Sequence, residues 1–490
     1  MPLPIATNQP VLIHGLFSIS PDRARLYQLN DTSTQDQGPA KWNNWLLKGP
    51  VPLAWTRLLS NLASVYPNQP AFERWPQSLG DTRDPLSSAL EKVLGVIEKE
   101  SLALWPTDIG YMTTKDALLG TGTESIALRN ALREARAPIV YVPEQLQHRS
   151  NILFKDRILC PQSLCHFMRT IDGQIKSWSD PTKLEILEYL LSEPEFTNYG
   201  GLELFPFKDG IYRSVGEYIA FVHRDKLEET LFSLEDFCNL DIEKLSKTAQ
   251  QALKHGCESS TIHPSIRYRS ARCLREYCMS TLFKNVPKDR DEFVLDECAA
   301  GIVTEVWTWI SKYTNCILDK EFSSLWLLPL SNGHHRKVKP ASGSSSVAYY
   351  APVGEIGDLM RKFDARISVK TLPLLDTGPT GLTPRFLSML MRSESVMSTL
   401  CMKDASNMIS FIEWLQRTWL LVDPILGEER LLLARLLVSH FPQTLTSLER
   451  KAVVGALSSL AIFQKVLWKG ESNLMFVIYF HFLVTATNNR

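Results

Sequence analysis

The chain has 490 residues, of which 44% are hydrophobic and 22% charged, so it can bury sizeable cores and is not a disordered protein. Its length predicts roughly three or four domains. Lys plus Arg and Asp plus Glu number 53 each, which argues against a nucleic-acid-binding surface large enough to dominate the chain.

The nine cysteines are an odd number and include no Cys-x-x-Cys pair. This pattern suits neither a zinc site nor a redox motif, so we expect reduced thiols in a cytoplasmic or nuclear protein. The first fifteen residues lack the basic and apolar stretches of a secretory signal. Residues 474–486 are strongly apolar but shorter than the roughly 20 residues of a membrane span, so we expect a buried strand or helix there.

The N-terminal segment has the pattern of two short strands. Residues 11–13 and 16–19 are apolar or alternating, and a His-Gly pair between them suits a turn. A helical pattern then runs over residues 42–66, interrupted by Pro50 and Pro52. We expect a strand pair followed by a broken helix.

The middle of the chain alternates helical and extended patterns. Apolar residues at helical spacing predict helices near residues 90–97, 126–132 and 184–191, and 139–142 reads as a short buried strand. The tryptophan-containing face of residues 302–310 is interpreted as core. The last part is predicted to be almost entirely helical, with helices at 386–400, 406–421, 428–441 and 448–460.

A nine-residue motif occurs three times, at residues 102–110, 202–210 and 325–333. It consists of Leu-x-Leu, a large apolar residue, Pro, three turn-forming positions and Gly. We interpret Leu-x-Leu as a short strand that Pro ends, followed by a turn and a second strand such as residues 211–215. Because the spacings and intervening helices differ, we interpret the copies as one reused strand–turn–strand edge, not as equal units of an array.

The expected fold is therefore α+β and helix-rich, with several small sheets, strand–turn–strand units covered by helices and a mostly helical C-terminal part. We expect four domains. They are an N-terminal strand pair with helices, a first α/β unit, a second α/β unit with a helical insert, and a helical end: residues 1–80, 81–195, 196–345 and 346–490.

One segment looks catalytic. Residues 374–378 read Leu-Leu-Asp-Thr-Gly, the active-site pattern of aspartic proteases, with Asp376 as the candidate acid. That chemistry needs two aspartates that share a proton, and the chain holds no second Asp-Thr-Gly or Asp-Ser-Gly. A turn after a short strand is the preferred interpretation, with a protease as the alternative.

Other catalytic patterns do not occur. The Gly-rich residues 119–123 lack the Gly-Lys-Ser/Thr ending of a phosphate-binding loop and are interpreted as a loop before a helix. The chain contains no His-Glu-x-x-His, no Gly-x-Ser-x-Gly and no metal-spaced cluster, so we predict no catalytic residue, cofactor or metal. The basic run 334–339 is interpreted as a solvated hairpin face, and binding of an acidic partner is the alternative.

In their order, these features resemble the sacsin family of large chaperone-like proteins, which repeat an ATPase domain similar to that of heat-shock protein 90 with a long extension after it. The resemblance covers residues 1–340 best and 341–470 only in style. The residues that carry it are Leu3-Pro4, the stretch 9–23, Trp42-Asn43-x-x-Leu46-Leu47 with Pro52 and Leu58-Leu59, residues 187–191 before the second motif, and Trp307-x-Trp309-Ile310 before the third. Here His14 lies one position from its place in the family pattern.

The chain departs from the family in its ATPase motifs. Glu235-x-x-x-Asn239 fits the metal-binding helix by spacing alone, and no Asp-x-Gly-x-Gly follows. The resemblance thus implies the region downstream of the ATPase domain. In the related chaperones an arginine of this region reaches the γ-phosphate of ATP, which makes Arg23 and Arg25 candidates for phosphate contact in trans. A surface arginine or a local ion pair is the alternative.

We therefore expect a non-catalytic, sacsin-like chaperone or co-chaperone segment that binds proteins, and neither nucleic acid nor membrane. A structural scaffold or remnant domain without chaperone activity is the first alternative. An enzyme, either the protease at Asp376 or an ATPase, is the second. Suppression of client aggregation without nucleotide would separate the first hypothesis from the scaffold.

Overall fold

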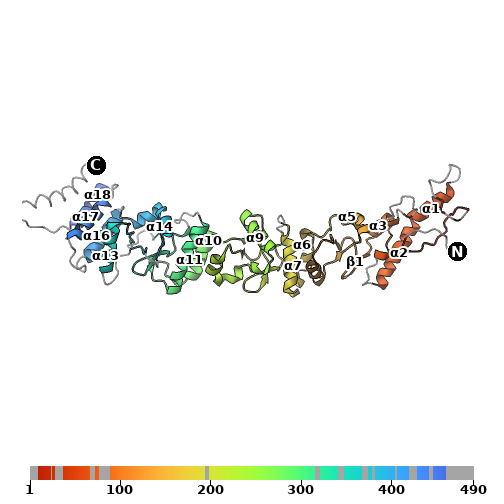
Figure 1. Cartoon of the computed structure of the whole chain (residues 1–490), viewed down its shortest axis with the longest axis horizontal. Coiled ribbons are helices and arrows are strands. Elements are labelled where there is room, and N and C mark those ends of the chain that lie inside the picture. Colours follow the sequence, from red (N-terminus) through yellow and green to blue (C-terminus); the bar gives the residue numbers. More distant parts are fainter. Residues whose placement is uncertain are drawn as a thin grey trace, which may run out of the picture. The chain divides into compact units, whose positions relative to one another are not determined.

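The computed structural model divides the chain into two compact units. Figure 1 shows its helices and strands in sequence colours. Unit 1 is Met1–Arg224 with Glu235–Tyr268, and unit 2 is Asp225–Leu234 with Arg269–Arg490. The chain therefore passes between the units three times. The structure describes residues 9–21, 23, 25–27, 37–66, 72–76, 86, 89–193, 198–314, 321–339, 347–366, 374–377, 381–402, 405–418, 427–440 and 445–458.

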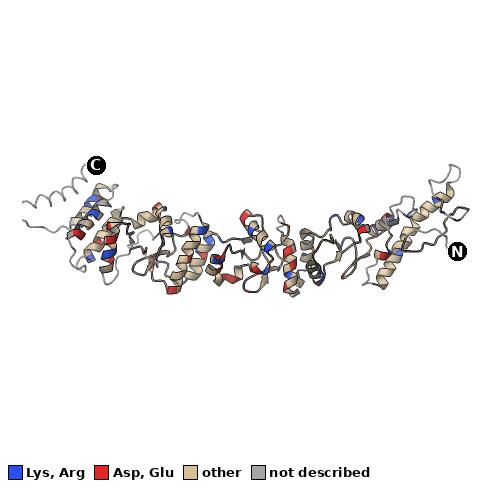
Figure 2. Ribbon diagram, in the orientation of Figure 1, with Lys and Arg blue, Asp and Glu red and all other residues tan. Residues whose placement is uncertain are grey.

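The predicted fold class is confirmed. Helices predominate, and the strands of the described ranges form sheets of only two or three members. Basic and acidic residues are interspersed within each unit (Figure 2). The four expected domains stay a prediction, and the apolar residues 474–486 lie outside the described ranges.

The helical pattern of residues 42–66 becomes two helices, α1 (Gly38–Lys48) and α2 (Pro50–Val65). The break is at Gly49, whose backbone is not helical. Pro50 is the first residue of α2 and Pro52 lies in its first turn, where a missing N–H costs nothing because it would have no helical partner. The prolines therefore start the second helix.

The predicted strands 11–13 and 16–19 are wrong, because residues 9–18 adopt no strand structure. The buried amide of Asn43 takes the place of a partner strand. Its Oδ1 accepts from the Ser18 N–H at 2.7 Å, and its Nδ2 donates to the carbonyls of Ser18 at 2.6 Å and Tyr27 at 3.0 Å. The only pairing in this described segment is a single bridge between Ile19 and Leu26.

Each nine-residue motif forms a β-hairpin, as predicted, but its first strand starts later than expected. The Leu-x-Leu segment is a tight turn in which the N–H of the second leucine donates to the carbonyl of the first, at 2.9–3.0 Å in all three copies. The following large apolar residue and Pro are the strand. The hairpins are β1 (Trp105–Thr107) with β2 (Gly110–Met112), β5 (Phe205–Pro206) with β6 (Tyr212–Arg213), and β10 (Leu328–Pro329) with β11 (His335–Arg336).

The backbone conformation explains why the last residue of the motif is glycine in every copy. Gly210 and Gly333 close three-residue loops with φ of +83° and +81°, a region that side chains disfavour. In the first copy Gly110 has φ +121° and already belongs to the second strand, so that hairpin is one residue shorter. The glycine is therefore repeated because each hairpin needs a residue with positive φ at this position.

The equivalence of the copies extends beyond the hairpin, which the sequence did not predict. In each copy one residue of a short central strand accepts a hydrogen bond from a neighbouring segment, and the next residue donates one to a segment on the other side. The bonds are Leu159 N to Leu119 O (2.8 Å) and Gly120 N to Val140 O (2.9 Å), Leu240 N to Phe221 O (2.9 Å) and Val222 N to Arg267 O (3.2 Å), and Leu375 N to Tyr349 O (2.9 Å) and Tyr350 N to Leu400 O (2.9 Å).

The central strands lie in parallel pairings that require a crossover. β3 (Leu118–Leu119) pairs with β4 (Ile139–Val140) across α4 (Ile126–Glu134). β7 (Ala220–Phe221) pairs with β8 (Ile266–Arg267) across a longer connection that includes α9 (Lys247–Ser259). In the third copy Tyr349 and Leu374 form a parallel bridge across α13 (Glu355–Arg366).

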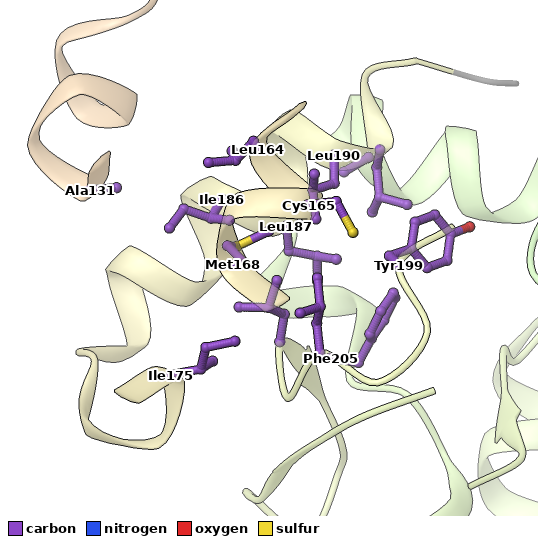
Figure 3. Close-up of a cluster of buried hydrophobic side chains, with 14 of the residues drawn as sticks. Ala131, Leu164, Cys165, Met168, Ile175, Ile186, Leu187, Leu190, Tyr199 and Phe205 are labelled. Carbon is purple, nitrogen blue, oxygen red and sulfur yellow. The ribbon is translucent and has the colours of Figure 1, made fainter. Parts of the chain in front are cut away.

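The large apolar residue of each motif is fully buried: Trp105, Phe205 and Leu328. Figure 3 shows Phe205 together with Leu164, Cys165 and Met168 of α6 (Pro161–Thr170) and Ile186, Leu187 and Leu190 of α7 (Asp180–Leu191). Burying each such side chain stabilises the fold by roughly 1.5–3 kcal/mol. The predicted helix at 184–191 is confirmed, with Ser179 as its cap.

In unit 2 the predicted tryptophan face is confirmed as core. Trp307 of α11 (Glu297–Tyr313) donates its indole N–H to the Leu327 carbonyl at 2.8 Å. Trp309 donates to Glu228 Oε1 at 2.9 Å, and both side chains are buried. This bond fastens α8 (Lys226–Leu231) to α11, although α8 lies in a separate stretch of the chain.

Within the described residues the predicted helical end is confirmed apart from one break, and residues 419–421, 441 and 459–460 of the predicted helices lie outside the described ranges. The predicted helix 386–400 is two helices, α14 (Pro384–Met391) and α15 (Glu394–Leu400), because the Ser393 side chain caps the N–H of Val396 at 3.4 Å. The remaining helices are α16 (Ala405–Thr418), α17 (Gly427–Ser439) and α18 (Ser447–Ser458). The rest of unit 2 adds α10 (Ala271–Tyr277) and β9 (Glu292–Phe293), while unit 1 adds α3 (Ala89–Lys99) and α5 (Glu144–Leu153).

Two glycine substitutions in unit 1 should change stability in opposite directions. Gly210→Ala forces a side chain into the left-handed region and should lower the free energy of unfolding by about 1–2 kcal/mol. Gly95→Ala, in the exposed middle of α3 where a Cβ meets nothing, should raise it by about 0.5–1 kcal/mol. Urea denaturation, followed by hydrogen exchange of unit 1 peptides, measures both. A Gly210→Ala variant as stable as the wild type would contradict the turn assignment.

Candidate functional site

The most site-like geometry in unit 1 is at the carboxyl end of β3. This strand has a parallel neighbour on each side, β4 and the bridge residue Ile158. In open α/β sheets, ligands bind outside the carboxyl ends of the strands. The chain leaves β3 through the Gly-rich loop and enters α4, whose first N–H groups face the loop.

The loop conformation follows from its glycines and its cap. A Cβ at Gly120 would meet the Tyr141 ring at 2.4 Å, so only glycine lets this ring pack on the strand end. Gly122 has φ +85°. Ser125 then caps α4 by accepting from the Leu128 N–H at 3.0 Å.

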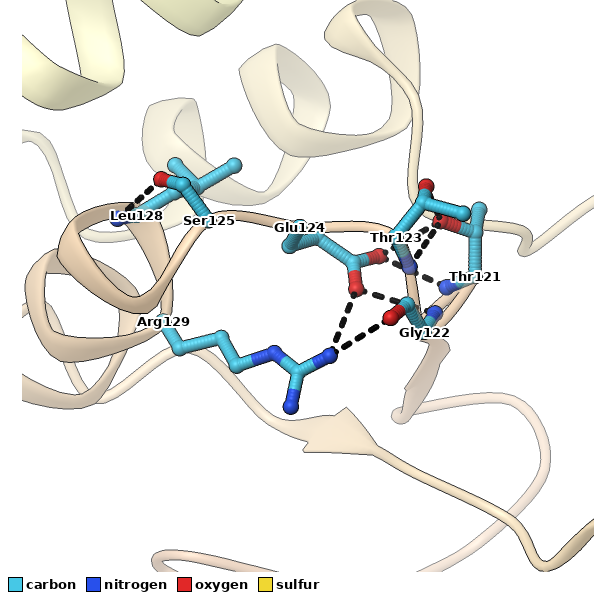
Figure 4. Close-up of polar contacts among 7 residues, drawn as sticks. All are labelled: Thr121, Gly122, Thr123, Glu124, Ser125, Leu128 and Arg129. Carbon is cyan, nitrogen blue, oxygen red and sulfur yellow. Dashed lines mark hydrogen bonds and ion pairs between the residues drawn. The ribbon is translucent and has the colours of Figure 1, made fainter.

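The carboxylate of Glu124 fills the place that an anion would take in this loop (Figure 4). Its Oε1 accepts from the Thr121 N–H at 2.6 Å and the Thr121 hydroxyl at 2.9 Å, and its Oε2 accepts from the Gly122 N–H at 2.9 Å. Arg129 lies 3.8 Å from Oε2 and donates to the Gly122 carbonyl at 2.7 Å. The Glu124 side chain is only 3% exposed.

A cavity of about 390 Å³ opens beside this loop and is acidic. Besides Glu124 it holds Glu185 and Glu188 of α7, and burial together with the Glu188 charge raises the pKa of Glu185. Burial also raises the pKa of Tyr141, next to the loop, to about 12. The loop N–H groups already donate to Glu124, and carboxylates line the cavity. The site therefore repels a phosphate. Its lining is Thr121, Thr123, Glu124, Ser125, Leu128, Glu185, Glu188 and Tyr189.

Glu124 was not predicted from the sequence as part of a site. A signal was available, because Thr121-x-x-Glu124 has the Ser/Thr-x-x-Glu spacing at which a glutamate folds back onto backbone N–H groups near a helix start. The Gly-rich loop before a helix was predicted and is confirmed.

Arg23 and Arg25 lie in the N-terminal turn that starts at Ser20. Both are exposed, and Arg23 has φ +58°. The turn is closed by the Ser20 N–H, which donates to the Arg25 carbonyl at 3.0 Å, and by the Arg25 N–H, which donates to the Ser20 hydroxyl at 3.2 Å. The backbone therefore holds the turn and leaves both guanidinium groups at the surface, and their phosphate contact in trans stays a prediction.

Asp376 occupies a position that recurs in the second copy. Its N–H donates to the Pro329 carbonyl at 2.8 Å, and the Asp241 N–H donates to the equivalent Pro206 carbonyl at 2.9 Å. Asp241 starts a short 3₁₀-helix, and the Asp376 carbonyl accepts from the Leu382 N–H at 2.9 Å. The equivalence favours the interpretation of Asp376 as a residue that follows a strand, and a protease stays the alternative.

Glu235 and Asn239 do not share a helix face. Glu235 has non-helical backbone angles inside the short 3₁₀ segment Ser233–Cys238. Asn239 is buried and forms a parallel bridge with Phe221. The spacing match to the metal-binding helix of the ATPases therefore has no matching geometry.

The basic run 334–339 is not a solvated face, because His335, Arg336 and Lys337 are all buried. The reason is β9, which pairs with β11 on the side away from β10, so β11 is the central strand of a three-stranded sheet.

The buried basic groups of β11 are partly compensated. Lys337 Nζ lies 3.3 Å from Asp291 Oδ1 and donates to the Lys288 carbonyl at 2.9 Å. Burial lowers the pKa of Arg336, and Glu292, directly across in the register, opposes this together with Asp291. Burial also lowers the pKa of His335 to about 4, against the opposing charge of Asp376.

Glu124→Ala should destabilise unit 1 by about 1–3 kcal/mol, because two loop N–H groups lose a charged acceptor. Glu124→Gln should cost less, since one oxygen remains. The control is Glu98→Ala on the exposed face of α3, which should change the free energy of unfolding by less than about 0.5 kcal/mol. Urea denaturation with hydrogen exchange of unit 1 peptides compares the three. Equal effects at positions 98 and 124 would show that the loop does not need the carboxylate.

Unit 2 should lose stability as the pH falls from 6.5 to about 4. In this window the unfolded histidine binds a proton and the buried His335 does not, so acid favours unfolding by up to roughly 3 kcal/mol. His335→Leu should flatten the pH dependence, whereas His334→Gln, which changes the half-exposed neighbour, should retain it. Hydrogen exchange of peptides spanning β11, in urea above pH 6.5 and near pH 4, gives the comparison. An unchanged slope in the His335→Leu variant would refute the assignment.

Three broader observations frame the site. Among the described residues, no group of three or more His, Cys, Asp or Glu side chains is placed to hold a metal ion. None of the described helices is both long and apolar enough to cross a membrane. Comparison of the chain with protein-family models, with curated proteins and with solved structures finds no match.

Proposed function

We propose that the chain is a non-catalytic, sacsin-like chaperone or co-chaperone segment that binds apolar, acid-flanked segments of other proteins through α1. The observation that carries the proposal is an exposed aromatic pair on this helix. Trp42 and Trp45 stack with ring centroids 5.1 Å apart, and Trp45 is 56% exposed. Stacked tryptophans at a surface are typical of protein-interaction sites.

The exposed pair is part of a larger apolar patch. Trp42 donates its indole N–H to the Leu16 carbonyl at 2.6 Å, and the Leu16 side chain is 85% exposed. The Asn43 bonds hold the same N-terminal segment against α1. We call Leu16, Trp42 and Trp45 the N-terminal apolar patch.

The charge of the two helices at the patch favours an acidic partner. Residues 38–65, which form α1 and α2, include Lys41, Lys48 and Arg57 and no Asp or Glu. A partner segment with acidic residues beside apolar ones would complement both the charge and the aromatic surface.

Two further features support a non-catalytic role. The loop at the carboxyl end of β3 is occupied by Glu124 instead of being open to phosphate, and Glu235 and Asn239 do not form the ATPase helix. The described cysteines are free thiols, which suits the cytoplasmic or nuclear location that is part of the proposal. The scaffold without chaperone activity stays the alternative.

The test is suppression of aggregation of a chemically denatured client, followed by light scattering with and without ATP. The wild-type chain should suppress aggregation equally in both conditions. Trp45→Ser should lose about half of this activity or more, because it removes the centre of the N-terminal apolar patch. Val353→Ser, which removes an exposed apolar side chain from unit 2, should act like the wild type. Failure of the wild type to suppress aggregation would favour the scaffold.

A further inference from the structure

Unit 1 contains a second cavity, of about 520 Å³, whose chemistry is opposite to that of the acidic one. It lies beside Ile158, the other parallel neighbour of β3, where the chain turns into α6. Its volume is in the range of small-molecule pockets. The polar groups on its wall that bear on a ligand are Lys155, Arg157, Cys160, His166, Arg169 and Asn198.

The cavity is basic. Lys155, Arg157 and Arg169 are cationic side chains, and Asp156 is the one carboxylate in its lining. In the described part of the chain, none of these three cations forms an ion pair. An excess of uncompensated positive charge in a concave site attracts anions.

The two arginines are held by the protein backbone and not by acidic side chains. Arg157 donates through Nη2 to the Lys115 carbonyl, while its Nε–H is buried and has no hydrogen-bond partner. Arg169 donates to the carbonyl and side-chain oxygens of Asn198, at 2.8 and 2.7 Å. Carbonyl partners position a guanidinium without neutralising it, so both groups keep their full charge for a ligand.

The start of α6 adds to the positive potential. Cys160 caps this ten-residue helix, with its Sγ accepting from the Ser163 N–H at 3.5 Å, and both residues lie on the cavity wall. The N-terminal end of a helix carries a partial positive charge that favours phosphate groups. The cavity therefore combines a helix start with three cationic side chains.

We propose that this cavity binds a small phosphate-bearing metabolite. The phosphate lies between Lys155 and Arg157 near the start of α6. Arg169 and His166 line the remainder of the cavity, where the organic part of the ligand lies. The site is separate from the Glu124 loop, where the protein's own carboxylate takes the anion position.

Cys160 provides a local reporter of binding. It is partly exposed on the cavity wall, whereas Cys165 is buried and donates to the Asn198 carbonyl at 2.9 Å. Burial also raises the pKa of Cys165, which lowers its thiolate fraction. A ligand in the cavity should therefore slow alkylation of Cys160 and leave the exposed Cys298 of unit 2 unaffected.

The experiment uses the full chain with pyrophosphate as the probe, at matched ionic strength in sodium chloride. Calorimetry measures affinity, and iodoacetamide labelling with peptide mass spectrometry measures protection of Cys160. Lys155→Gln and Arg157→Gln should each weaken binding about five-fold or more. The control Lys99→Gln, an exposed cation at the end of α3, should bind like the wild type.

Each outcome decides the proposal. Loss of affinity in both variants, with Cys160 protected in the wild type, supports it. Absence of binding, binding that does not protect Cys160, or equal affinity in the Lys155→Gln and Lys99→Gln variants overturns it. The Lys155 variant keeps the test valid if Arg157→Gln does not fold, because no other residue depends on the Lys155 ammonium for a hydrogen bond in the described structure.

Discussion

The architecture depends on three very short central strands that are hydrogen-bonded on both sides. A buried backbone amide or carbonyl without a partner is costly, so a strand of two residues persists only if both flanking segments supply partners. Leu119, Phe221 and Tyr349 each receive a bond from one side, and the following residue donates to the other. In each copy the hairpin precedes this strand, and a connection that contains a helix follows it.

Elements with a strong local signal could be predicted from the sequence. The helix at 184–191 and the tryptophan face of α11 have clear periodicity, and the Pro and Gly positions of the motif mark a hairpin. The start of the first strand could not be predicted. Alternation in Leu-x-Leu fits both a strand and the tight turn that the backbone adopts, and only the hydrogen bond between the leucines separates them.

The predictions that are wrong concern segments whose hydrogen-bonding partner is distant in the sequence. The N-terminal strands fail because Asn43 takes the backbone groups of Ser18. The basic run is buried because β9 covers β11, and a strand of two residues leaves no detectable pattern. Long-range pairings of this kind are set by tertiary structure and not by local propensity.

The candidate sites show the same limit. The Gly-rich loop was visible in the sequence, and the spacing of Thr121 and Glu124 gave a hint of what fills it. The basic cavity was not visible, because its cations come from the segment between α5 and Ile158 and from α6, and their excess over acid appears only when the chain is folded. A neutral total charge thus conceals two cavities of opposite charge in unit 1, one acidic and one basic.

The interleaved course of the chain has a consequence for inheritance. Segment 225–234 belongs to unit 2 but is encoded between two parts of unit 1. A fragment ending at Tyr268 would carry the apolar Leu231 and Phe232 without their core, and a fragment starting at Arg269 would leave the Trp309 indole without Glu228. Neither unit can therefore be shuffled, duplicated or lost alone by a single recombination event, so gene rearrangement should transmit the two as one piece.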